Sequence, residues 1–230
     1  MKPTYTVLTL VLTVFTGWSQ CTAQFIIWDQ QPDASSTGVI DQEIPDTPAS
    51  STYLVNDATF NKAVLVDSVT TYFSNFSGAW ETNVTTGVLN IFDGDGLLAS
   101  DDPQTGGDFG PGLVNVTIED FGNNVIGVTT ENLNISLAAG TYWFGLTPIA
   151  DSSIPQEFHL DSAGGIVGFE SQFRNPEGGF GLGTDWAGAD GLLAGYQDGA
   201  FTVTTVPEPS ACLLAGLSFL GVVSYRGNRR

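Results

Sequence analysis

Short stretches of alternating apolar and polar residues, separated by turn residues, restrict the fold of this chain more than any other feature. Segments rich in Val, Ile, Thr, Phe and Tyr recur from residue 53 to residue 205, with Gly, Asn or Asp between them. We predict each to be a β-strand, and the candidates are Ala63 to Phe73, Gly87 to Phe92, Leu113 to Ile118, Asn124 to Thr130, Leu133 to Leu137, Gly140 to Leu146, Gln156 to Leu160, Ile166 to Phe169 and Ala200 to Val206.

Helical periodicity is missing from the region between the two ends of the sequence, where no window of ten or more residues carries a convincing apolar stripe. We therefore predict an all-β fold, a single antiparallel β-sandwich with jelly-roll or immunoglobulin-like connectivity. Residues 29–52 and 174–199 are rich in turn-forming residues and are expected to be long loops, the second anchored by Trp186.

The N-terminal end has the pattern of a secretory signal peptide. Lys2 precedes an apolar run from Tyr5 to Phe15, and the small residues Cys21 and Ala23 match a signal peptidase site before Gln24. Lipid attachment at Cys21 is disfavoured because the preceding residue is a glutamine, where a lipobox needs a small residue. We expect residues 1–23 to form a helical signal peptide that is removed after export.

The C-terminal end has three parts: Val206-Pro207-Glu208-Pro209-Ser210, an apolar run from Ala211 to Tyr225, and the basic residues Arg226, Arg229 and Arg230. The two prolines hold the glutamate between them in an extended strip that suits a protease groove. As a helix the apolar run is roughly 22 Å long, against a hydrocarbon core of about 30 Å, so it predicts a short transmembrane helix. The arginines are expected on the cytoplasmic side.

This tail resembles the PEP-CTERM sorting signal of exported bacterial proteins, which is sometimes catalogued as an ice-binding protein C-terminal domain without implying any affinity for ice. The resemblance covers residues 206–230 only. It implies that a membrane-embedded exosortase recognises the Pro-Glu-Pro triplet while the helix holds the protein in the inner membrane. A plain C-terminal membrane anchor is the alternative.

Together the two ends predict three regions: a signal peptide over residues 1–23, an exported domain over 24–205, and a sorting signal over 206–230. The expected partners are the Sec translocon, signal peptidase and exosortase, with exopolysaccharide as a further candidate. The expected location is the inner membrane during processing, and then the cell envelope or the extracellular space.

The exported region is strongly acidic. The chain has 25 acidic residues and a formal charge of −19, yet four of its six basic residues lie in the terminal signals, which leaves only Lys62 and Arg174 between them. Such a domain repels nucleic acid, so nucleic-acid binding is excluded. Cys21 and Cys212 also lie in the signals, so no disulfide is expected in the exported region.

A cluster of aspartates is the candidate metal site. Asp93 and Asp95 alternate with glycines, and Asp101 and Asp102 follow. Carboxylates around a backbone that is free to turn suit Ca²⁺, but Leu97 and Gln104 stand where an EF-hand loop needs oxygen ligands. A turn without an ion is the alternative, and no other cofactor is expected.

Aromatic residues suggest a glycan contact. The segment from Gly140 to Leu146 places Tyr142, Phe144 and Leu146 on one face of a strand and Trp143 on the other, and Trp143 and Trp186 are the candidate sugar-stacking residues. Glycoside hydrolysis needs only two suitably spaced carboxylates, but none lies in a recognisable motif. With His159 as the single histidine and no usable cysteine, zinc and Cys/His catalysis are excluded.

These observations favour a non-enzymatic protein of the cell surface or of an exopolysaccharide matrix, sorted by a PEP-CTERM/exosortase system. A glycan-binding β-sandwich module is the alternative function, and a glycoside hydrolase is a weaker one.

Overall fold

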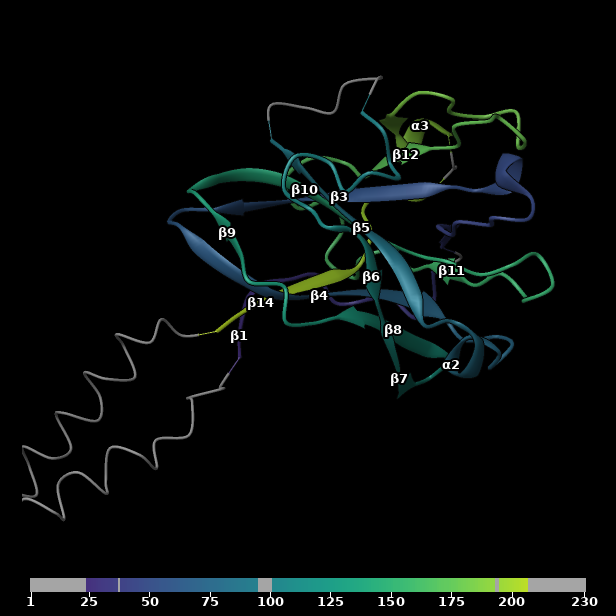
Figure 1. The fold of residues 1–230 in the computed structure, drawn as a ribbon, viewed down its shortest axis with the longest axis horizontal. Helices are drawn as coiled ribbons and strands as arrows, with labels where there is room; N and C mark the ends of the chain where they lie inside the picture. Colours follow the sequence, from purple (N-terminus) through teal and green to yellow (C-terminus); the bar gives the residue numbers. More distant parts are fainter. Residues whose placement is uncertain (1–23, 37, 95–100, 193–194, 207–230) are drawn as a thin grey trace, which may run out of the picture. The chain divides into compact units, whose positions relative to one another are not determined.

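A computed structural model describes residues 24–36, 38–94, 101–192 and 195–206 (Figure 1). Residues Ile26–Thr205 form one compact unit, and the residues before and after it are grouped apart from it. The predicted signal-peptide helix and C-terminal helix lie outside the described residues. Within the described part of the chain, no helix has both the length and the apolar character needed to cross a membrane.

The first sheet has eight strands around the long strand β4 (Val64–Ser74). Its main order is β1 (Phe25–Asp29), β14 (Phe201–Thr205), β4, β11 (Phe158–His159) and β2 (Val39–Ile40). Strands β14 and β11 pair with the same edge of β4. The opposite edge of β4 pairs with β9 (Ile135–Leu137) and β8 (Val125–Thr130), and β7 (Thr117–Gly122) pairs with β8. A strand of 11 residues can serve several short partners along both of its edges.

The second sheet has six strands, in the order β13 (Ala187–Gly188), β12 (Gln172–Arg174), β3 (Tyr53–Phe60), β10 (Gly140–Pro148), β5 (Thr86–Asp93) and β6 (Gly112–Asn115). Its strand pairs are antiparallel, and the register places Tyr142 of β10 between Ala58 of β3 and Asp93 of β5. Three single-turn helices complete the described elements: η1 (Pro48–Ser50), α2 (Trp80–Asn83) and α3 (Ala189–Leu192).

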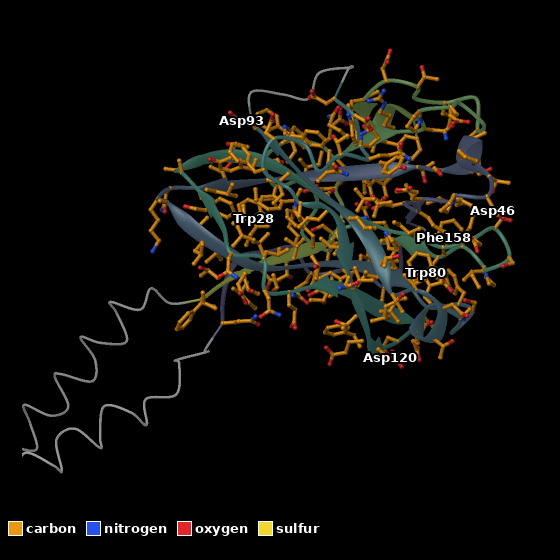
Figure 2. The ribbon with its side chains drawn as sticks, viewed as in Figure 1. Trp28, Asp46, Trp80, Asp93, Asp120 and Phe158 are labelled. Atoms are coloured by element: carbon orange, nitrogen blue, oxygen red, sulfur yellow. The ribbon has the colours of Figure 1, made fainter. Side chains whose placement is uncertain are left out.

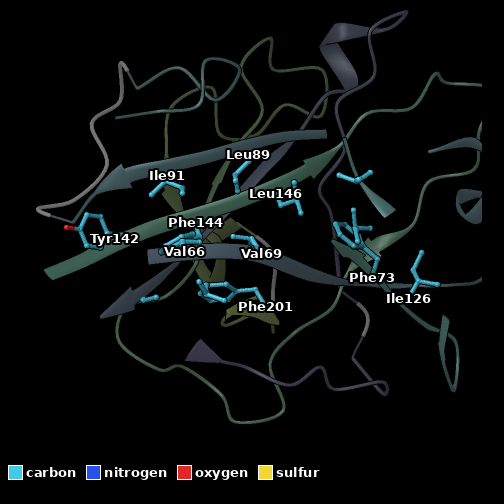
Figure 3. Close-up of a cluster of buried hydrophobic side chains, with 14 of the residues drawn as sticks. Val66, Val69, Phe73, Leu89, Ile91, Ile126, Tyr142, Phe144, Leu146 and Phe201 are labelled. Atoms are coloured by element: carbon cyan, nitrogen blue, oxygen red, sulfur yellow. The ribbon is translucent and has the colours of Figure 1, made fainter. Parts of the chain in front are cut away.

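The two sheets share one apolar core (Figure 3). Phe144 of β10 and Phe201 of β14 come from different sheets, and their ring centroids lie 6.1 Å apart. The predicted two-faced strand is confirmed, because Tyr142, Phe144 and Leu146 all enter this core. The further large side chains in it are Phe60, Val66, Val69, Phe73, Trp80, Leu89, Ile91, Ile126 and Leu137.

A smaller apolar cluster covers the other face of the second sheet. It contains Tyr53, Val55, Phe92, Trp143 and Trp186. Most of β3 is therefore buried on both faces: Ala58 and Phe60 lie in the main core, whereas Tyr53 and Val55 lie in the outer cluster. The loops that follow β5 and β11 supply the cover.

The all-β prediction is confirmed, and most predicted strands lie within a residue or two of observed ones. Residues 166–169 are an exception: their prediction as a strand is wrong, because Gly168 has φ +95° and the segment forms a loop. Residues 113–118 are another, because they divide at Val116 between β6 of one sheet and β7 of the other. Strand β1 was not among the predicted strands, and it lies at the edge of the first sheet beside β14.

Candidate functional site

Most of the predicted sorting and cleavage residues lie outside the described part of the chain. These are Ala23, Pro207, Glu208, Pro209, Ser210, Arg226, Arg229 and Arg230. Gln24 and Val206 are described, and they flank the first residue of β1 and the last residue of β14. The predicted processing positions at both ends therefore adjoin the compact unit without entering any of its described strands.

The predicted calcium ligands do not form a described metal site. Asp93 accepts the Gly94 amide at 2.8 Å, and Asp102 accepts the Gln104 amide at 2.9 Å, so these carboxylates stabilise turns of the backbone. The described residues contain no group of three His, Cys, Asp or Glu side chains placed to hold a metal ion. Asp95 lies outside the described residues, and calcium binding there stays a prediction.

Trp143 and Trp186 do not offer a face to a sugar. Their side chains are 3% and 8% exposed, and both belong to the outer apolar cluster. Trp143 packs against Phe169, while Trp186 donates its indole N–H to the carbonyl of Asp101 at 2.8 Å and packs against Phe92. The burial of both rings does not favour the predicted glycan contact, which stays a prediction, because both rings are used to fix loops on the sheet. The expectation that Trp186 anchors its loop agrees with these contacts.

The acidic side chains of the domain mostly project outward, as Asp46, Asp93 and Asp120 show in Figure 2. A few are buried, and two of them, Asp57 and Asp198, belong to a group of buried polar side chains. We call it the Asp198 cluster: Gln30, Asn56, Asp57, Ser171 and Asp198, each no more than 3% exposed. Its members come from the end of β1, the middle of β3, and the segments that precede β12 and β14.

Three uncharged groups surround the carboxyl group of Asp198. Its Oδ2 accepts the side-chain amide of Gln30 and the backbone amide of Val167, the second at 3.0 Å. Its Oδ1 lies 3.2 Å from Oγ of Ser171. The pKa of Asp198 is raised to about 7, mainly by burial and also by the nearby charge of Asp57, while the hydrogen bonds from Val167, Gln30 and Ser171 oppose this rise.

Ser171 is the central hydrogen-bonding residue of the Asp198 cluster. The Gly199 amide donates to Oδ1 of Asn56 at 2.9 Å and to Oγ of Ser171 at 2.7 Å, which orients the Asn56 amide with its oxygen toward both groups. The Ser171 hydroxyl donates to this oxygen at 2.5 Å, and it also donates to Oδ1 of Asp198 at 3.2 Å. Ser171 therefore connects the Asn56 side chain to the Asp198 carboxyl group.

Asp57 lies next to Asn56 on β3 and points to the opposite face of the sheet. Its Oδ1 accepts the Phe169 amide at 2.8 Å, whereas its Oδ2 has no hydrogen-bond partner in the described structure. Burial raises the pKa of this carboxyl group as well. At 1% exposure for Asp57 and 0% for Asp198, neither carboxyl group is accessible to a polysaccharide, so this pair does not form a hydrolase site.

A second buried polar pair, Asp41 and His159, links the two sheets. Oδ2 of Asp41 lies 3.0 Å from Nδ1 of His159, and its Oδ1 accepts the Thr147 hydroxyl at 2.7 Å and the Leu54 amide at 3.2 Å. The other ring nitrogen of His159 donates to the carbonyl of Ala200 at 3.1 Å. Burial raises the pKa of Asp41, and the contact with His159 opposes that rise. All four polar contacts are internal, which indicates a structural role.

Comparison with known proteins identifies no relative: no family model, no curated protein and no solved structure matches this chain.

The Asp198 cluster was not predicted from the sequence, although one signal was present. Asn56 and Asp57 interrupt the otherwise apolar run Tyr53–Phe60, and polar residues inside such a run indicate a buried polar site. Ser171 and Asp198 lie in loop segments whose polarity is ordinary, so their convergence on Asn56 has no signature in the sequence.

Proposed function

We propose that this protein is a non-enzymatic component of the cell surface or of an extracellular exopolysaccharide matrix, exported through its signal peptide and sorted by an exosortase that acts on its tail. In this proposal Val206 to Ser210 form the recognition strip, and Arg226, Arg229 and Arg230 stop transfer at the inner membrane. The two antiparallel sheets form the exported domain, which we infer to be a β-sandwich of jelly-roll or immunoglobulin-like type.

The observation that carries the proposal is the match between the ends of the compact unit and the two signals. The unit spans Ile26–Thr205, whereas the signals predict an exported domain of residues 24–205. The tail resemblance supplies the sorting step. A domain that is complete between its processing positions can be exported and trimmed without losing a described strand.

The first and last strands of the unit lie side by side, which also supports trimming at both ends. Gln30 donates its backbone amide to the carbonyl of Phe201 at 2.9 Å, and Asp29 accepts the Thr202 hydroxyl at 2.9 Å. These two contacts show that β1 and β14 are antiparallel. The start of β1 and the end of β14 therefore lie at the same end of the first sheet (Figure 1). A tail at that position would hold the domain by one end.

The acidic surface fits a role outside the cell in a hydrated matrix. With 25 acidic residues against six basic ones, the chain repels anionic polymers and remains soluble with counterions from the medium. The buried positions of Trp143 and Trp186 remove the observation that favoured a dedicated glycan-binding module. Contact with an exopolysaccharide would then be weak and distributed over polar side chains.

The test is to replace Pro207, Glu208 and Pro209 by alanine in the producing cell and to follow the protein by fractionation. The triple variant should accumulate in the inner membrane, because the exosortase strip is lost while the apolar run remains. The matched control is Pro176→Ala with Glu177→Ala, since this Pro-Glu pair lies in the domain and is not part of the tail. Equal release of the triple variant and the wild type would contradict the proposal.

A further inference from the structure

Residues 163–170 form a loop that covers the Asp198 cluster, and we call it loop 163–170. It presents three apolar side chains to solvent: Ile166 is 47% exposed, Val167 41% and Phe169 58%. Gly165 and Gly168 take positive φ values of +70° and +95°, which allows the loop to turn closely over the sheet. Exposed apolar residues in a glycine-rich loop gain little from burial, so other contacts must hold the loop in place.

Two buried carboxyl groups supply those contacts. Asp198 accepts the Val167 amide at 3.0 Å, and Asp57 accepts the Phe169 amide at 2.8 Å. Gly168 lies between these two points so close to Asp57 that a Cβ atom there would stand 2.3 Å from Oδ2. The Phe169 ring packs on Trp143 with centroids 6.0 Å apart. The loop thus forms the lid over both carboxyl groups.

The protonation state of Asp198 determines how stable the closed position of loop 163–170 is. When the carboxyl group is protonated, it brings no charge into this buried position, and Gln30, Val167 and Ser171 still contact it. When it is ionised, a negative charge lies at a side chain that is 0% exposed. The ion is also buried close to Asp57, and no charged side chain is among its hydrogen-bond partners.

The other titratable groups around Asp198 do not remove this cost. The nearby carboxyl group of Asp57 on β3 raises the pKa of Asp198 through its charge. Asp161, from the segment after β11, is engaged by the backbone amides of Gln197 and Asp198, which donate to it. Tyr196 is buried nearby with a pKa well above its usual value, mainly through burial, and stays neutral. His159 is engaged by Asp41 and the Ala200 carbonyl.

We propose that Asp198 is a proton-operated latch for loop 163–170: the protonated carboxyl group holds the loop closed over the second sheet, and ionisation opens the loop so that water reaches the carboxylate. The Val167 amide lies directly on Asp198, so moving the loop is the shortest route for hydration. Opening would also separate Phe169 from Trp143 and change the apolar surface that Ile166, Val167 and Phe169 present. This inference rests on the Asp198 cluster and is independent of the sorting proposal.

The test is hydrogen exchange of the Val167 and Phe169 amides in the full-length protein, corrected for the intrinsic rate at each pH. Two conditions suffice, about pH 5 and about pH 9, which lie on either side of the pKa of about 7. Above that pKa the ratio of ionised to neutral Asp198 rises about tenfold for each pH unit. Protection of these two amides should fall by up to the same factor, while amides of β5 and β10 in the main core keep their protection.

Asp198→Asn provides the discriminating variant, because an asparagine reproduces the protonated acid. Its oxygen can accept from Gln30 and Val167, and its amide can donate to Ser171. We expect loop 163–170 to stay protected at both pH values in this variant. The matched control is Asp161→Asn, a neighbouring carboxyl-to-amide change that should keep the pH dependence of the wild type.

Two results would overturn the latch. One is equal protection of Val167 and Phe169 in the wild type at both pH values. The other is loss of protection in β5 and β10 together with the loop, since this would show unfolding of the whole domain. Both results are measured on the wild type, so the proposal remains testable even if Asp198→Asn fails to fold.

Discussion

At the scale of single residues, the buried carboxyl groups reverse the usual relation between acidity and stability. The pKa of Asp198 is raised from 3.8 to about 7, and those of Asp41 and Asp57 are also raised, each mainly by burial. A raised pKa means that the folded state binds the proton more tightly than the unfolded state. The stabilisation is therefore complete below about pH 4, and it is lost as the pH rises through the folded pKa of about 7.

The domain should accordingly become more stable, and its Tm should rise, when the pH is lowered from about 8 to about 5. Each unit by which a folded-state pKa is raised corresponds to about 1.4 kcal/mol of this effect. Thermal unfolding of the wild type and of Asp198→Asn measures it, and the variant should show a flatter profile with a higher Tm at the alkaline end. A wild-type Tm that falls steadily on acidification through this range would contradict the assignment of the proton.

Gly168 provides a second test at this scale. An alanine there would adopt φ +95° and place its Cβ 2.3 Å from the Asp57 carboxylate, so Gly168→Ala should cost at least about 2 kcal/mol of unfolding free energy. Gly181→Ala is the matched control, because its φ is +71° and no atom lies within 4 Å of the added Cβ. It should cost about 1 kcal/mol. Equal costs in urea unfolding would mean that loop 163–170 does not rest on Asp57.

At the scale of elements, the sequence predicts strands well where apolar core residues recur at alternate positions. The segment that became β10 carries its core residues at alternate positions, so its limits and its inward face follow from the pattern. Residues 166–169 have the composition of a strand but no second strand to pair with, and Gly168 turns the chain away from the sheet. Pairing partners and positive φ angles depend on tertiary contacts that a local pattern does not contain.

The same limit explains what was missed in the Asp198 cluster. The interruption of β3 by Asn56 and Asp57 is visible in the sequence, but Ser171 reaches Asn56 from 115 positions further along the chain, and Asp198 contacts Ser171 from a further 27 positions away. For the aromatic residues, the sequence suggested a site that their burial does not favour. Trp143 and Trp186 have the composition of a glycan site, yet the loops after β5 and β11 bury them, and loop placement is not periodic.

Strand β10 belongs to the second sheet, and its core residues also contact the first sheet. A core substitution in this strand therefore tests the fold directly. Phe144 is buried, and its ring contacts Phe60 of the same sheet and Phe201 of the other. Phe144→Ala should lower the unfolding free energy by about 3–5 kcal/mol. Leu113→Ala on β6 is the control, because that side chain is 69% exposed, and its effect should stay within about 0.5 kcal/mol. Similar losses for the two variants would show that the two sheets do not share the described core.

At the scale of the whole molecule, the limits of the compact unit connect the fold with the proposed export of the domain. The unit spans Ile26–Thr205, and both cysteines and four of the six basic residues lie outside it. What is exported in our proposal is an acidic, cysteine-free β domain. Its buried polar groups Asp41, His159 and Asp198 make internal hydrogen bonds, and in our proposal Asp198 also controls loop 163–170.

The most direct measurement of the central claim is the intact mass of the protein recovered from outside the producing cells. We predict a chain that begins at Gln24 and lacks the apolar run Ala211 to Tyr225 together with the terminal arginines, because signal peptidase and an exosortase have each acted once. Recovery of the full chain from Met1 to Arg230, or its confinement to the cytoplasm, would contradict the account.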